Sequence, residues 1–131
     1  MAHPKQFDDD DPVLVRLGEI CLAMPGAAMK VSHGRPSFFT KKIFAGYGAV
    51  LKGDHHSGRY DQALVFMPTD DEREALLGDD RFFVPAYWGP YGWLGLDLSG
   101  KGVDWTEVSE LVEESFRLTA PKTLVKQLDE P

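Results

Sequence analysis

The sequence predicts an α+β domain of two layers, in which helices cover one face of an antiparallel sheet of about five to six strands. Helical periodicity of apolar residues occurs near both ends of the chain, while short apolar or alternating runs fill residues 27–67 and 81–98. Turn residues separate these runs at short intervals, as antiparallel hairpins require. The 131 residues suffice for one domain, and with 43% hydrophobic residues they can bury a single core.

The first helix is predicted to begin at Asp11-Pro12 and to end at Pro25-Gly26. Its apolar residues recur at steps of three and four: Val13, Leu14, Leu17, Ile20, Cys21 and Met24. Because Cys21 falls on this stripe, we expect a buried thiol rather than a reactive one. As the one cysteine of the chain, it excludes an intramolecular disulfide and a site of several thiolates. We expect residues 1–11 to form a flexible acidic tail and residues 12–131 to form the domain.

Residues 27–67 are predicted to form a meander of strands. Thr40-Lys41-Lys42 separates two runs that contain phenylalanine, and is expected to be the tip of a hairpin. Residues 53–59, GDHHSGR, are typical of a longer and mobile connection. Asp70–Leu77 follows as a short helix, because it has acids in its first turn and Gly78 after its end.

The last third of the chain predicts a second hairpin and two helices. Residues 81–98 contain two strands with Gly89–Gly92 as the turn between them. Asp104 and Glu107 form a variant of the capping box at the start of the strongest helix. The apolar face of that helix is Trp105, Val108, Leu111, Val112 and Phe116. Pro121 begins a short final helix.

Charge is distributed unevenly along a chain of net charge −7. Between Lys30 and Arg59, six basic residues oppose one acid, a formal charge of +5, and the rest of the chain carries −12. We therefore predict a basic face of strands and hairpins that contacts the phosphates of double-stranded DNA. Its candidate residues are Lys30, Arg35, Lys41, Lys42, Lys52 and Arg59. The alternative is that these lysines protect the edges of the sheet from unwanted pairing.

Two further motifs predict a binding groove as the alternative function. In His33-Gly34-Arg35-Pro36, a histidine and an arginine flank a glycine and could hold an anion, although a tight turn between strands explains the same pattern. Tyr87, Trp88 and Trp93 surround glycines and could stack a planar ligand, although in a small domain such residues more often fill the core. A groove lined by these side chains would bind a small ligand or a protein partner.

The sequence contains no recognisable motif of catalytic residues or of metal ligands. His55-His56 beside Asp54 lacks a second ligand pair, so a polar loop is the better interpretation. Serines adjacent to His33 and His56 do not form a recognisable nucleophile motif. We therefore expect no enzyme, no catalytic residues, no metal and no cofactor.

Four segments of the sequence resemble those of a known family. In chain order they are CLAMPGA, HGRPSF, PAYWGPYGWLGLDL and DWTEVSELVEESFRLTAPKTLV. They closely resemble the YjbR/MmcQ-like family of small bacterial proteins, over about Val13 to Leu128. The resemblance implies a compact α+β domain, similar to frataxin-like or secretion-chaperone-like folds. Members of the family are usually labelled DNA-binding, by analogy with a double-wing arrangement of hairpins, and no catalytic residues come with it.

These observations together predict a nonenzymatic DNA-binding protein, with a domain that binds a small ligand or a protein partner as the alternative. The first residues lack the pattern of a secretory signal, and no run of 18 uncharged apolar residues occurs. We therefore expect a cytoplasmic protein that does not associate with membranes and that is a monomer or a weak homodimer.

Overall fold

The computed structural model describes residues 4–130, which form four α-helices, six strands and one short 3-10 helix. In chain order these are α1 (Pro12–Leu22), β1 (Ala28–Ser32), β2 (Arg35–Phe39), β3 (Ile43–Tyr47), β4 (Ala63–Phe66), α2 (Asp70–Leu77), β5 (Phe82–Phe83), η1 (Gly89–Tyr91), β6 (Leu94–Asp97), α3 (Trp105–Thr119) and α4 (Lys122–Asp129). The predicted α+β class is confirmed.

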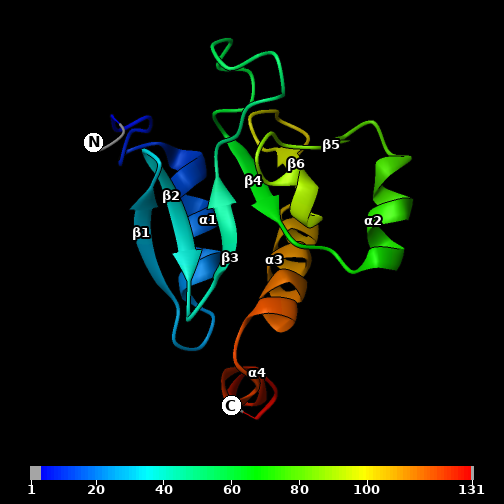
Figure 1. Cartoon of the computed structure of the whole chain (residues 1–131). Helices are drawn as coiled ribbons and strands as arrows, with labels where there is room; N and C mark the ends of the chain where they lie inside the picture. Colours follow the sequence, from blue (N-terminus) through cyan, green and yellow to red (C-terminus); the bar gives the residue numbers. More distant parts are fainter. Residues whose placement is uncertain (1–3, 131) are drawn as a thin grey trace.

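The six strands form one sheet in the order β1-β2-β3-β4-β6-β5, with every neighbouring pair antiparallel. The first four strands follow the order of the chain, whereas β6 lies between β4 and β5. Helices α1 and α3 lie behind the sheet in Figure 1, α2 stands beside β5, and α4 lies below the other elements. The sheet is therefore covered by helices on one face, which is the predicted two-layer arrangement.

Helix α1 begins where the sequence predicts, because the Asp11 carboxylate accepts a hydrogen bond of 2.9 Å from the Val13 N–H. Leu14, Leu17 and Cys21 form its buried face. The helix ends at Leu22, before the predicted Pro25. The residue before a proline avoids the helical conformation, so the helix cannot continue through Met24. Cys21 is fully buried, as expected, and this burial raises the pKa of its thiol.

Helix α3 has the predicted start and the predicted buried face. Asp104 accepts hydrogen bonds from the N–H groups of Thr106 and Glu107, at 3.0 and 3.2 Å. The ring of Phe116 meets that of Phe44 on β3 edge to face, with ring centroids 5.3 Å apart. The core therefore lies between the helices α1 and α3 and the face of the sheet that they cover.

Ser115 is a polar residue in the middle of this core, with no exposed surface. Its hydroxyl donates to the carbonyl oxygen of Phe44 at 2.5 Å and accepts from the N–H of Met67 at 2.9 Å. Both partners are main-chain groups: Phe44 belongs to β3, and Met67 directly follows β4. One serine therefore fastens α3 to β3 and to the end of β4.

The second hairpin folds across the helix-free face of the sheet. A β-carbon at Gly95 of β6 would collide with the ring of Phe83, and that ring stacks on Tyr60 with centroids 3.8 Å apart. Strand β5 has only two residues, shorter than predicted, because the nearby Pro85 cannot donate to a ladder. The chain then turns through η1, at the predicted position, into β6.

The segment before α1 also contacts the domain. The N–H of Gln6 donates to the carbonyl oxygen of Gly34 at 2.8 Å, and Phe7 packs against the core. Residues 1–3 of the expected tail lie outside the described residues. In residues 4–130, none of the helices has both the length and the apolar character that a bilayer crossing requires.

Candidate ligand-binding cleft

A cleft of about 770 Å³ opens among the β1–β2 turn, strands β2 and β3, the loop that contains His55, and residues 86–88. Four of the five residues proposed for ligand binding line it: His33, Arg35, Tyr87 and Trp88. The fifth, Trp93, is not part of the lining. Its ring meets that of Trp88 at a centroid distance of 4.9 Å and an angle of 61°, so it supports Trp88 from behind.

The turn that carries His33 is a two-residue hairpin turn between Ser32 and Arg35, which are paired in the sheet. Both of its central residues have a positive φ, 52° at His33 and 81° at Gly34. This combination is typical of a type I′ turn, which matches the twist of the strands that it joins. The turn interpretation is therefore right, and the same turn places His33 on the wall of the cleft.

Arg35 is held in place at the foot of this turn. Its Nη2 donates to a carboxylate oxygen of Asp61 at 3.1 Å and to the amide oxygen of Gln6 at 3.3 Å. The side chain is only 16% exposed. Its Nη1 lies against Gly48, where a β-carbon would collide with it, and Gly48 also has a φ of 87°. Position 48 therefore requires glycine on both counts.

Trp88 forms an apolar wall of the cleft. Its six-membered ring lies over Gly46 of β3, where a β-carbon would be 3.4 Å from Cζ2. A β-carbon would only touch the ring at this distance, but a larger side chain at position 46 would displace the indole from the strand. This arrangement combines both interpretations of the aromatic segment, because Trp88 packs on the sheet and also faces the cleft.

Tyr87, beside it, has a φ of 70° and is 72% exposed. Its hydroxyl lies 3.4 Å from Nδ1 of His55, so the 51–58 loop and the aromatic segment meet at the cleft. Within residues 4–130, His33 and Tyr87 are the two non-glycine residues with a positive φ. A hairpin turn contains His33, and a turn closed by the hydrogen bond of 2.8 Å from the Gly89 N–H to the Pro85 carbonyl oxygen contains Tyr87. A positive φ costs free energy for a residue with a β-carbon, so the backbone of Tyr87 carries strain at the cleft.

Tyr47 also lines the cleft, and sequence reasoning missed its role. Its hydroxyl donates to Asp11 at 2.5 Å, and Gln62 donates to the same carboxylate at 3.0 Å. Burial, together with the neighbouring Asp11 carboxylate, raises the pKa of Tyr47. These three residues lie far apart in the chain. The pairing of β3 with β4 brings Tyr47 near Gln62, and the packing of α1 against the sheet adds Asp11.

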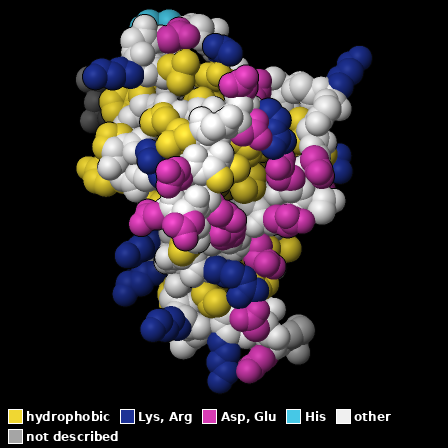
Figure 2. Space-filling view, turned by 90° about the vertical axis from the view of Figure 1, so that its right-hand side faces the viewer, with side chains coloured by type: hydrophobic (Ala, Val, Ile, Leu, Met, Phe, Trp, Pro, Cys, Tyr) yellow, Lys and Arg dark blue, Asp and Glu magenta, His cyan; other side chains and the backbone are white. Residues whose placement is uncertain are grey.

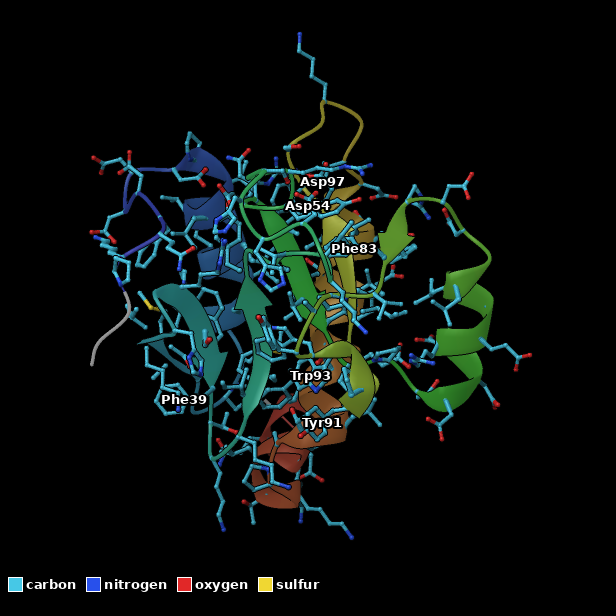
Figure 3. The ribbon with its side chains drawn as sticks, turned by 45° about the horizontal axis from the view of Figure 1, so that its top comes forward. Phe39, Asp54, Phe83, Tyr91, Trp93 and Asp97 are labelled. Carbon is cyan, nitrogen blue, oxygen red and sulfur yellow. The ribbon has the colours of Figure 1, made fainter. Side chains whose placement is uncertain are left out.

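The six cations proposed to contact DNA are distributed over separate parts of the molecule. Lys41 and Lys42 lie in the β2–β3 turn, whereas Lys52 lies in the loop beyond the opposite end of β3. Figure 3 shows this separation, because Phe39 next to the turn and Asp54 in the loop lie at opposite ends of the sheet. Lys41 and Lys42 are thus separated from Lys52 by the length of β3.

The other three basic residues each have a local partner. The Nζ of Lys30 lies 4.6 Å from the ring centroid of Phe39, and Arg35 is bound to Asp61. Arg59 lies over the ring of Tyr60 and lines a second hollow of about 290 Å³, together with several acids. Those acids are Asp80, Asp97, Asp104 and Glu107.

Acidic side chains dominate the side of the molecule that carries α2. Figure 2 shows them across the middle of that face, where the first turn of α2 contributes Asp70, Asp71 and Glu72. Lysine and arginine side chains gather toward the lower end, near α4. Within residues 4–130, no three histidine, cysteine or acidic side chains are grouped so that they could hold a metal ion.

Comparison with known proteins supports an assignment at the level of the family. A search of curated proteins finds no match. The family model described as YjbR matches residues 22–118. This range includes all six strands, the β1–β2 turn, the Tyr87-Trp88 segment and most of α3. It covers most of the chain, and we conclude that the chain belongs to the YjbR family.

Proposed function

We propose that this protein binds a small organic molecule in the cleft, without catalysing a reaction. The observation that supports the proposal is the meeting of two motifs that are about 50 residues apart in the sequence. The His33–Arg35 turn forms one wall and the Tyr87-Trp88 segment forms another. A volume of about 770 Å³ lies within the range of clefts that bind small ligands.

The arrangement of the walls also supports a ligand rather than a filled core. Arg35 is fixed by Asp61 and Gln6, and Trp88 is fixed by Gly46 and Trp93. Side chains that are held before a ligand arrives lose little conformational freedom on binding. The strained backbone of Tyr87 is a further feature that concentrates at binding sites.

Binding can be tested with phenylnaphthylamine, an uncharged dye that fluoresces in apolar sites. We expect saturable fluorescence with the wild-type protein, and energy transfer from the tryptophans to the bound dye. The Trp88→Leu variant should lose most of this signal. Trp105→Leu is the matched control, since Trp105 is a half-buried tryptophan outside the cleft lining. No saturable binding to folded wild-type protein would contradict the proposal.

Binding of double-stranded DNA stays a prediction from the sequence, and the distribution of the six cations gives it less support than the cleft gives to a small ligand. Anisotropy of a labelled duplex at about 50 and about 200 mM salt tests it, because phosphate contacts weaken steeply with salt. Tight, salt-dependent binding that Lys41→Gln and Lys52→Gln weaken equally would favour DNA as the ligand. Such a result would require both ends of β3 to reach one duplex.

A further inference from the structure

We infer that the ligand of this cleft is a planar organic anion, with its negative group on Arg35 and its flat apolar part against Trp88. This inference rests on the proposed function, and it adds the chemical class of the ligand. It follows from the charge of the cleft lining, from the hydrogen-bonding state of Arg35 and from the position of the indole.

The lining of the cleft differs in charge from the rest of the molecule. The chain contains 21 acidic residues and 14 lysines and arginines, but none of the described residues that line the cleft is acidic. Arg35, His33 and His55 are its basic residues. In an acidic protein, a cleft without acids and with a fixed arginine favours a negatively charged ligand over a neutral or positive one.

Arg35 has hydrogen-bonding capacity left for such a group. Both side-chain hydrogen bonds that it makes within residues 4–130, to Asp61 and Gln6, use Nη2. The N–H groups of Nη1 and Nε are not used in these bonds. Nη1 lies against Gly48, which itself lines the cleft. Asp61 does not line the cleft and has a side chain that is 52% exposed, so water screens its charge.

The remaining wall selects the shape of the ligand. The indole of Trp88 lies along β3 over Gly46, and Pro36 and Ile43 add further apolar surface to the cleft. A flat ring can pack against such a wall, and Trp93 holds the indole in one orientation. A carboxylate, a phosphate or a sulfonate attached to a ring system therefore satisfies the charged and the apolar walls together.

The test compares two dyes that share their rings and differ in charge. Anilinonaphthalene sulfonate carries one negative group, which phenylnaphthylamine lacks. We expect wild-type protein to bind the sulfonate at least about tenfold more tightly, because a charged hydrogen-bonded pair contributes about that factor. The Arg35→Gln variant should lose this preference, so that the ratio of its affinities for the two dyes falls by about tenfold, because the charged partner of the sulfonate is gone. Arg117→Gln, which removes another arginine bound to carboxylates, is the control.

Two outcomes separate the inference from the proposed function. If both dyes bind wild-type protein equally, the inference is overturned while small-ligand binding stands, and this comparison needs no variant. If neither dye binds, the proposed function fails as well. Displacement of the sulfonate dye by naphthoate or by naphthyl phosphate distinguishes a carboxylate from a phosphate ligand, and displacement by neither would overturn the inference.

Discussion

The guanidinium of Arg35 lies so close to Gly48 that a β-carbon at position 48 would collide with its Nη1. Gly48→Ala is therefore expected to lower the free energy of unfolding by about 2–3 kcal/mol, from the positive φ and from the collision. In an Arg35→Ala background the collision with Nη1 is absent and only the contact of 3.0 Å with the Asp61 carbonyl oxygen remains, so the same change should cost at least about 0.5 kcal/mol less. Urea denaturation of the four proteins measures this difference.

Gly53 provides the control for this cycle. It has a similar φ of 84°, but a β-carbon there would meet nothing within 4 Å. Gly53→Ala should therefore cost about 1 kcal/mol, with or without Arg35. Equal coupling of Gly48 and Gly53 to Arg35 would mean that the close approach does not affect stability.

Ser115→Ala is expected to destabilise the protein by about 1–3 kcal/mol, because it leaves the buried carbonyl oxygen of Phe44 and the partly buried N–H of Met67 without their partner. Chemical denaturation followed by circular dichroism measures the change. Ser109→Ala on the same helix is the control, since Ser109 is only partly buried. Its replacement should change stability by less than about 0.5 kcal/mol. A similar loss in both variants would argue against the bridge between α3 and the sheet.

Tyr87→Gly should raise the free energy of unfolding by about 1 kcal/mol, because glycine adopts a φ of 70° without strain. The same change should weaken dye binding, since it removes a side chain from the cleft. Tyr91 is a matched tyrosine that is 77% exposed and outside the cleft lining. Its backbone does not have a positive φ, so Tyr91→Gly should lower stability and leave dye binding unchanged. Thermal denaturation and dye titration of the two variants test both statements.

Glu114 is expected to make stability depend on pH near neutrality. Burial, and then the hydrogen bond with Glu72 of α2, raises the pKa of Glu114 to about 7 from an ordinary value of 4.5. The folded state thus binds this proton more tightly than the unfolded state does. The contribution of the protonated Glu114 to the free energy of unfolding is therefore fully present below about pH 4.5 and is lost as the pH rises through about 7. Because Glu114 is partly exposed, solvent screening should limit the loss to about 1 kcal/mol.

The Glu114→Gln variant should flatten this dependence, because the amide can donate to Glu72 at every pH. Unfolding midpoints between about pH 5 and 8 provide the measurement. Glu110→Gln, an exposed position on the same helix, should retain the wild-type profile. A wild-type protein whose midpoint rises over this range would contradict the assignment of Glu114.

Local patterns account for the part of the structure that could be predicted. Caps at Asp11 and Asp104, the apolar spacing of α1 and α3, and the glycines of the turns act over a few residues, so they can be recognised in the sequence. The His33–Arg35 turn and the Tyr87-Trp88 segment were recognised for the same reason. That they form one cleft depends on how β3 pairs with its neighbours, which no local pattern determines.

The predicted basic face illustrates the limit of counting charge along the chain. Residues 30–59 contain strands that run from one end of the sheet to the other, so neighbours in this window separate in space. The Asp61 partner of Arg35 lies just beyond the window. A local surplus of positive charge in the sequence therefore does not determine how these cations are arranged on the surface.

The position of β6 between β4 and β5 determines which part of the molecule can form first. The meander of β1, β2 and β3 needs only short loops, whereas the pairing of β4 with β6 must close a loop of residues 67–93 that includes α2. Closing a longer loop costs more chain entropy before any contact compensates for it. We expect the rate-limiting barrier of folding to be the closure of this loop, and variants in the β4–β6 pair to slow refolding more than variants in β1.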